Sequence, residues 1–269
     1  EDLSTDYHWE PNQTRSNMTE GFAWLQLDKN GYNNHFKVKK EEIDYLLMGS
    51  SHTEGFNVAS DESIAYLLNK FLPEDYVYNI SMSGHYFFTN IKNLENAFNK
   101  YKPKKGIIIE TFNVTFSEND IQKILKGEFP IINLHTDNKY VYYCQKYFPA
   151  IRNLFLQAKS WYTVSEKCYY KSINKNEKEE KMLSLQELIA FTRSIVPNKI
   201  KIIIFYHPST LIDKKGDIVN LDKNKVSNFH SICLENKIIF IDTTSDFLDL
   251  YKTRHILGHG FINTKVGVG

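Results

Sequence analysis

The sequence predicts an α/β fold in which a parallel sheet carries helices on both faces. Three short apolar runs, 43–49, 76–81 and 106–112, point to it, because each is followed by a segment with helical spacing. The runs lack the polar alternation of half-exposed strands, which is typical of strands buried on both faces. The same rhythm returns later, with apolar runs at 200–206 and 238–241. We therefore expect a doubly wound sheet of about five strands.

The segments between these strands have helical spacing and helical boundaries. A helix is expected from about Ser60, and Pro73 ends it because proline cannot continue the backbone hydrogen bonding. Residues 184–187 read Ser-Leu-Gln-Glu, the pattern of a capping box, and predict a helix from Ser184 to Pro197. The other expected helices span 86–101, 118–126 and 223–236.

The chain divides by composition into a short N-terminal part and one large domain. Residues 1–40 are polar and irregular, and we interpret them as a strap that packs on the main domain, with one strand near Phe22–Leu27. Residues 41–269 form the α/β domain, interrupted at about 117–183 by a helical, aromatic-rich insertion. The insertion is a candidate lid or substrate wall; alternatively, its aromatic residues are ordinary core.

Composition excludes few functions. The chain has 33 basic and 32 acidic residues, a formal net charge of +1, which does not favour a nucleic-acid-binding protein. Its three cysteines match no zinc pattern and are too few and odd in number for a disulfide framework. No apolar run approaches the roughly 20 residues that cross a bilayer. The chain begins at Glu1 and stops at Gly269 in a glycine-rich turn, so we expect a fragment or a processed chain with a truncated C-terminus.

Polar residues follow three strands at the point where each strand ends. Ser51 follows the first strand, Gly84 the second and Asn113 the third, at intervals of 33 and 29 residues. One βαβ step takes about 30 residues, so these residues are expected at one edge of adjacent strands. A hydroxyl, a backbone N–H and a side-chain amide at one point suit the tetrahedral intermediate of acyl transfer. Alternatively, Gly49-Ser50-Ser51 is only a strand-to-helix turn with serine caps.

The segment Gly49-Ser50-Ser51-His52-Thr53-Glu54-Gly55 resembles the first sequence block of the SGNH/GDSL hydrolase superfamily, and Gly84 and Asn113 match the second and third blocks. The resemblance implies a flavodoxin-like three-layer α/β/α sandwich with a mainly parallel sheet. It also implies that Ser51 is the nucleophile of an esterase. The Ser51 N–H, the Gly84 N–H and the Asn113 side chain would then form the oxyanion hole.

Two positions depart from the pattern of that family. Ser50 stands where the family usually has Asp, a change that leaves the nucleophile in place. Val114 stands where an Asp usually follows the Asn of the third block, which removes a secondary hydrogen bond.

The expected site has no clearly assigned base to activate Ser51. The last family block, Asp-x-x-His, does not occur near the C-terminus. The tail from Gly258 resembles a variant in which a Gly-Phe-x-Asn-Thr segment precedes the catalytic His, which would then follow the last residue. Among the residues present, His259 is the best candidate base and His255 the next, unless His259 is only a structural hydrogen-bonder. A Ser–His dyad, or an acid such as Asp242, would complete the site.

Three further histidines are candidate substrate contacts: His52, His85 and His207. Alternatively, His52 and His85 cap the helices that they precede, and His207 is a surface-turn residue before Pro208. The scattered histidines have no recognisable metal-ligand spacing, and no phosphate loop or dinucleotide fingerprint occurs. We therefore expect neither a metal ion nor a cofactor.

These observations predict a serine esterase that removes an O-acyl group, with O-acetyl the expected case, through an acyl-Ser51 intermediate. The partner would be a small-molecule or carbohydrate ester, since aromatic faces suit sugar rings. Two alternatives remain: an O-acyltransferase acting on a polysaccharide, and a non-catalytic binding module that kept the fold. Family resemblance favours a bacterial cell-envelope or extracellular location over a cytoplasmic one.

Overall fold

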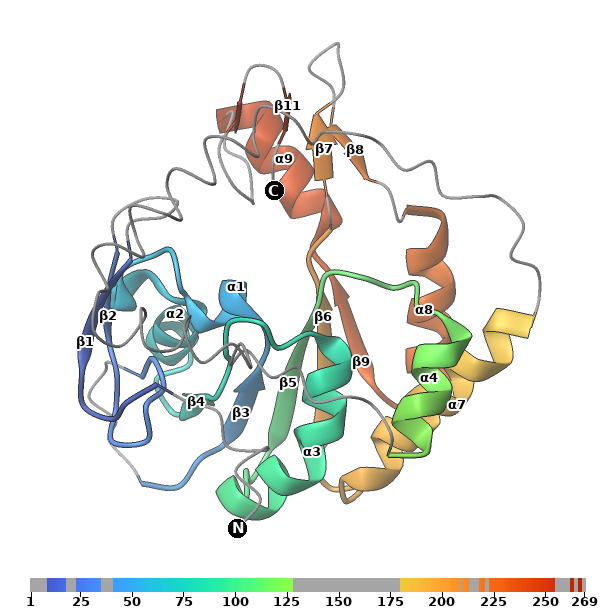
Figure 1. Ribbon diagram of the computed structural model, residues 1–269, viewed down its shortest axis with the longest axis horizontal. Coiled ribbons are helices and arrows are strands. Elements are labelled where there is room, and N and C mark those ends of the chain that lie inside the picture. Colours follow the sequence, from blue (N-terminus) through green and yellow to red (C-terminus); the bar gives the residue numbers. More distant parts are fainter. Residues whose placement is uncertain are drawn as a thin grey trace, which may run out of the picture. The chain divides into compact units, whose positions relative to one another are not determined.

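A parallel sheet of five strands forms the centre of the computed structural model (Figure 1). Its spatial order is β4-β3-β5-β6-β9, which in chain order is 2-1-3-4-5, the flavodoxin-like arrangement. The predicted fold class is therefore confirmed. The strands are β3 (Tyr45–Met48), β4 (Val77–Asn79), β5 (Gly106–Thr111), β6 (Lys201–Tyr206) and β9 (Ile239–Asp242).

The structure describes residues 9–17, 23–34, 41–127, 180–208, 210–212, 218–220, 223–254, 262–263 and 266–267. The chain divides into two compact units, 1–130 with 179–269, and 131–178, and all described residues belong to the first. The aromatic-rich part of the predicted insertion lies outside the described residues, so the insertion and its boundaries stay a prediction. None of the described helices is long and apolar enough to cross a membrane.

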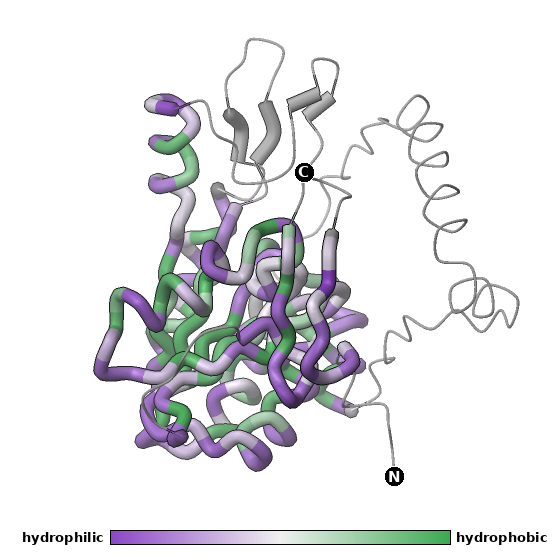
Figure 2. The backbone as a smooth tube through the Cα atoms, turned by 90° about the vertical axis from the view of Figure 1, so that its left-hand side faces the viewer, coloured by the Kyte–Doolittle hydropathy of each residue, from purple (hydrophilic) through white to green (hydrophobic). Residues whose placement is uncertain are grey.

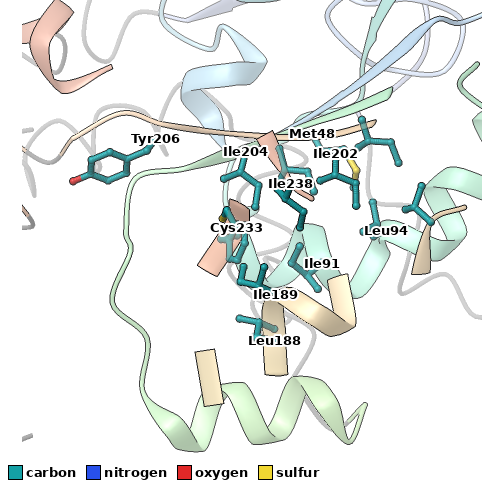
Figure 3. Close-up of a cluster of buried hydrophobic side chains, with 14 of the residues drawn as sticks. Met48, Ile91, Leu94, Leu188, Ile189, Ile202, Ile204, Tyr206, Cys233 and Ile238 are labelled. Carbon is teal, nitrogen blue, oxygen red and sulfur yellow. The ribbon is translucent and has the colours of Figure 1, made fainter. Parts of the chain in front are cut away.

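The larger of the two cores lies between one face of the sheet and four helices. These are α3 (Phe87–Tyr101), α4 (Glu118–Leu125), α7 (Glu180–Ile195) and α8 (Lys223–Glu235). Figure 3 shows the Ile side chains of β6 above those of α7, with α3 beside them. Strand residues alternate between faces, so Leu46 and Met48 join this core while Leu47 faces the other way. Along the tube in Figure 2, hydrophobic stretches alternate with hydrophilic ones.

A second, smaller core covers the opposite face of β3 and β4. Leu47 and Val77 pack there against Ala65 of α2 (Ile64–Phe71). Ahead of α2 come the one-turn helix α1 (Ser51–Glu54) and the 3-10 turn η2 (Ser60–Glu62). The helix expected to start at Ser60 therefore begins later. Ser63 caps α2 by accepting a hydrogen bond from the Tyr66 N–H.

The N-terminal strap contains two strands where the sequence predicted one. β1 (Thr14–Asn17) pairs antiparallel with β2 (Ala23–Gln26), and alternate apolar residues of the second strand form a small buried cluster. Trp9 packs against both this cluster and the main core. The strap is therefore joined to the α/β domain by apolar contact as well as by hydrogen bonds.

Several elements differ from the sequence prediction. α7 begins at Glu180, so Ser184 lies inside the helix and the predicted capping box is wrong. The four residues from Glu180 to Leu183 are good helix formers and extend the helix ahead of Ser184. Helix α9 and two small hairpins were not predicted. These span Thr244–Arg254 (α9), Thr210–Ile212 with Ile218–Asn220 (β7 and β8), and Ile262–Asn263 with Val266–Gly267 (β10 and β11).

Candidate active site at the carboxyl edge of the sheet

The three strand ends predicted to carry the site lie on adjacent strands. β3 is paired with β4 on one side and with β5 on the other, so Ser51 follows the central strand of the three. The loop after β4 stays bonded to the end of β3, because the Met82 N–H donates to the Gly49 carbonyl at 3.2 Å. The predicted grouping of these strand ends is thus present in the topology.

The nucleophile turn, Gly49 to Gly55, is tightly packed. Ser50 is the N-cap of α1, and Ser51 is the first helical residue and half-buried. A Cβ on Gly49 would lie 2.3 Å from a carboxylate oxygen of Glu110 and 2.5 Å from the Thr53 hydroxyl. Only glycine fits at that point. Gly55 closes the helix with φ of 78°, a left-handed conformation that favours glycine.

The loop predicted to supply an oxyanion donor, Met82 to His85, is called the oxyanion loop here. It is a tight turn closed by the His85 N–H donating to the Met82 carbonyl at 3.0 Å. Gly84 occupies its third position with φ of 86°. That position of a type II turn needs positive φ, which glycine adopts without strain. Gly84 is therefore required by the turn, independently of any role for its N–H.

The side chain of Asn113 is oriented by its own loop. The Thr115 N–H donates to the Asn113 carbonyl oxygen Oδ1 at 2.9 Å. With its oxygen bound in this way, the donor of the amide is Nδ2. A donor is what an oxyanion hole requires of this residue.

A buried carboxylate, Glu110, joins the nucleophile turn to two neighbouring strands. It accepts hydrogen bonds from the Ser50 N–H at 2.5 Å, the Ser50 hydroxyl at 2.9 Å, and the Thr53 hydroxyl at 2.5 Å. His207, at the end of β6, donates from Nε2 at 2.5 Å. We refer to Ser50, Thr53, Glu110 and His207 as the Glu110 cluster.

The cluster keeps Glu110 ionised. Burial by itself raises the pKa of this carboxyl, but the hydrogen bond and electrostatic attraction of His207 oppose it, as do the bonds from Thr53 and Ser50. Together they lower the pKa to about 2. The Glu110 carboxylate thus reaches the Ser50 backbone from the neighbouring strand β5.

The histidines proposed as substrate contacts have different environments. His207 is buried and bound to Glu110, so it is not the surface-turn residue of the alternative interpretation. The His52 side chain is 47% exposed, with its ring 4.9 Å from that of His207 and Nδ1 3.2 Å from the Ser50 hydroxyl. His85 is half-buried and lines a cavity of about 50 Å³ beside α3. Burial lowers the pKa of His85.

The expected base is not among these residues. His259 and His255 both lie outside the described residues, so their roles stay predictions. Asp242, the candidate acid, is exposed at the end of β9 and accepts hydrogen bonds from the Thr244 N–H and hydroxyl. It therefore caps α9 in this structure.

One described group has the composition of a metal site. Potential ligand atoms of His52, Glu110 and His207 lie within 4.8 Å of one another, a proximity that their sequence positions do not reveal. Both Glu110 oxygens, however, already accept hydrogen bonds from the cluster. A metal ion would have to displace the His207 bond, so the donor set does not require one.

Glu54 is a second buried carboxylate that the sequence interpretation did not single out. It lies on α1 and accepts hydrogen bonds from Ser83 in the oxyanion loop and from Trp9 in the strap. A usable signal was present for Glu110: a charged residue directly follows the apolar run 107–109, and a carboxylate in a buried strand needs partners. Nothing comparable marks Glu54.

No protein-family model matches this chain, and no curated protein matches it. Among similar solved structures is the psychrotrophic esterase EstA from Pseudoalteromonas sp., at 13% identity and TM-score 0.36, covering 76% of this chain and 84% of that one. A GDSL-like lipase from Bacteroides thetaiotaomicron has 13% identity and TM-score 0.35, covering 78% and 73%. A mutant acetyl-xylooligosaccharide esterase from Geobacillus has 15% identity and TM-score 0.35, covering 80% and 83%.

Several of the similar structures are named as esterases or as GDSL-like lipases. All of these TM-scores lie below 0.5 and all of the identities below 25%. The resemblance to the SGNH/GDSL superfamily therefore continues to rest on the three sequence blocks and on the adjacent strands that carry them.

Proposed function

We propose that this protein is a serine esterase that removes an O-acyl group through an acyl-Ser51 intermediate. The observation that carries the proposal is the strand order β4-β3-β5, which puts Gly84, Ser51 and Asn113 after adjacent strands. Each has a local structure suited to its role. Ser51 is a half-buried first helical residue, Gly84 is a turn glycine, and the Asn113 amide has its oxygen already bound.

The reaction has two balanced steps. Ser51 Oγ attacks the ester carbonyl carbon and gives its proton to a general base, for which His259 is the candidate. The tetrahedral oxyanion accepts hydrogen bonds from the Ser51 and Gly84 N–H groups and the Asn113 amide. The C–O bond to the alcohol breaks, and the alcohol leaves with that proton. Water then gives a proton to the base and attacks the acyl-Ser51 carbonyl, the bond to Ser51 Oγ breaks, Oγ takes the proton back, and the carboxylic acid departs.

The test is Ser51→Ala in the full-length protein, assayed on p-nitrophenyl acetate. We expect hydrolysis to fall at least 10³-fold, because the covalent route is removed. Intact mass of the wild-type protein after a short incubation should show one added acetyl group that Ser51→Ala does not acquire. Undiminished hydrolysis in Ser51→Ala would contradict the assignment, and Ser50→Ala is the matched control for changes in the turn itself.

The substrate we propose is a carbohydrate O-acetyl ester. Support comes from the high aromatic content of the chain, 17 Tyr and 18 Phe, since aromatic faces suit sugar rings. Release of acetate from an acetylated oligosaccharide faster than from p-nitrophenyl acetate, compared by kcat/KM, would support the proposal. A preference for the small aryl ester would oppose it.

A further inference from the structure

Glu54 lies one helical turn after Ser51 and is 1% exposed. Its Oε2 accepts hydrogen bonds from the Ser83 backbone N–H, at 2.6 Å, and from the Ser83 hydroxyl. Its Oε1 accepts from Trp9 Nε1 at 2.5 Å. One carboxylate thus joins three segments that are far apart in the sequence: the nucleophile helix, the oxyanion loop and the strap.

The contact with Ser83 bears directly on Gly84. Ser83 precedes Gly84 in the turn from Met82 to His85, and both polar groups of Ser83 that can donate are bound to the same oxygen. The other end of the turn is closed by the His85 N–H. The peptide that carries the Gly84 N–H therefore lies between two anchors, and the first of them comes from the helix that begins with Ser51.

The arrangement is unfavourable for the charged form of the Glu54 side chain. Burial raises the pKa of Glu54, and the bonds from Ser83 and Trp9 and the attraction of Arg15 offset only part of that rise. Arg15 stacks over the Trp9 ring, 3.4 Å from its centroid. A buried carboxylate with neutral donors is a poor contributor to stability, and such groups are commonly kept for a role at a functional site.

We propose that Glu54 is a positioning residue that holds the Gly84 N–H at a set distance and angle from Ser51, so that both address the same oxyanion. The inference rests on the proposed esterase function. Glu54 does not touch the substrate. It acts through Ser83, and its effect is expected on the transition state, where the oxyanion develops, and not on substrate binding.

The test compares Glu54→Gln with Glu62→Gln, the same change at an exposed glutamate in the next turn. Removing an oxyanion donor outright typically lowers kcat about 10²–10³-fold. Since Glu54→Gln displaces the donor without removing it, we expect kcat to fall about 10–100-fold, with KM changed less than about threefold. Ser83→Ala, which keeps the backbone bond, should lower kcat only a few-fold. Glu62→Gln should match the wild type.

Two further measurements separate positioning from folding and from the proposed function. We expect the Tm of Glu54→Gln to stay within about 4 °C of the wild type, because a buried charge is lost together with its hydrogen bonds. Amide hydrogen exchange at Ser83, which needs no substrate, should accelerate at least tenfold in Glu54→Gln and remain unchanged in Glu62→Gln.

Each result supports or overturns the inference. Unchanged exchange at Ser83, or unchanged kcat in Glu54→Gln while Ser51→Ala is inactive, overturns the role of Glu54 and leaves the esterase proposal standing. A drop in kcat that comes with a collapse of Tm assigns Glu54 a purely structural role. Full activity in Ser51→Ala contradicts the esterase proposal instead, and the accelerated exchange then still shows that Glu54 holds the loop.

Discussion

Two buried carboxylates at the carboxyl edge of the sheet are held in opposite ways. Glu110 is bound by His207 as well as by hydroxyl and backbone donors, and its pKa falls to about 2. Glu54 has Ser83 and Trp9 as hydrogen-bond donors, and burial raises its pKa. The hydrogen bond and electrostatic attraction of His207, together with the bonds from Thr53 and Ser50, outweigh the loss of hydration at Glu110, whereas the donors and the attraction of Arg15 do not outweigh it at Glu54. Ionised Glu110 is therefore expected to stabilise the folded edge, and ionised Glu54 to lower its stability.

The largest effect is expected from Glu110→Gln. The Gln side chain has the same shape, but one of its two polar atoms is a donor. At the Oε2 position that donor would face the Ser50 N–H and the Thr53 hydroxyl, and at the Oε1 position it would replace the acceptor of His207. We expect the free energy of unfolding to fall by about 3–5 kcal/mol, the usual result of breaking a buried pair. Urea denaturation measures it, with Glu95→Gln, exposed on α3, as the control. A loss similar to that of the control would show that the cluster does not stabilise the fold.

The pH dependence of stability should differ in sign between the two carboxylates. The folded pKa of Glu110 lies below the ordinary glutamate value of 4.5, so its contribution is present above about pH 4.5 and is lost as pH falls toward 2. A shift from 4.5 to about 2 corresponds to about 3 kcal/mol. The folded pKa of Glu54 is raised, so its contribution is present below pH 4.5 and is lost as pH rises through the folded pKa.

Unfolding measured against pH checks this contrast. The stability deficit of Glu110→Gln relative to the wild type should shrink between pH 6 and pH 3. The free energy of unfolding of Glu54→Gln should instead increase relative to that of the wild type as pH rises from 4 to 8. The same sign of change in both variants would refute the distinction between the two sites.

A smaller effect is expected from Gly49→Ala, which tests how closely Glu110 approaches the nucleophile turn. The added Cβ would meet Glu110 and Thr53 at 2.3–2.6 Å, so the turn must shift. We expect a loss of about 2–3 kcal/mol, in the range for overpacking a closely filled site. At Gly127 a Cβ meets no atom within 4 Å, so Gly127→Ala reports only the strain of its positive φ, about 1 kcal/mol. Equal losses at the two positions would mean that the contact is not tight.

The smallest effect is expected from Trp9→Phe, which removes one donor to Glu54 but keeps an aromatic ring beneath Arg15. A net loss of about 1 kcal/mol is usual for one hydrogen bond. Thermal unfolding measures it, with Trp24→Phe at an exposed position as the control. A loss above about 3 kcal/mol would show that Trp9 stabilises the protein mainly by packing the strap and not through its hydrogen bond to Glu54.

The fold could be predicted because its strands are short apolar runs at regular intervals. The run Ile107-Ile108-Ile109 can only be buried on both faces, and such strands belong to a parallel sheet with crossover helices. The prediction failed for the start of helix α7, which depends on polar residues and not on an apolar run. The Ser184 capping box is an acceptable helix start by pattern, but the residues before it also favour a helix, and no local rule says which start is used.

The candidate site likewise has a part that the sequence predicted and a part that it did not. The residues predicted to carry its chemistry, Ser51, Gly84 and Asn113, were chosen because each comes shortly after a predicted strand and matches a block of the resembled superfamily, and strand ends are local features of the sequence. The sequence by itself thus determined the strands, their parallel arrangement and the positions at their ends. Tertiary structure decided what surrounds them. The partners of Glu110 lie 57, 60 and 97 residues away in the chain, and they meet only because β5 pairs in register with β3 and β6. Hydrogen bonds across such separations depend on register and burial, which no local pattern specifies.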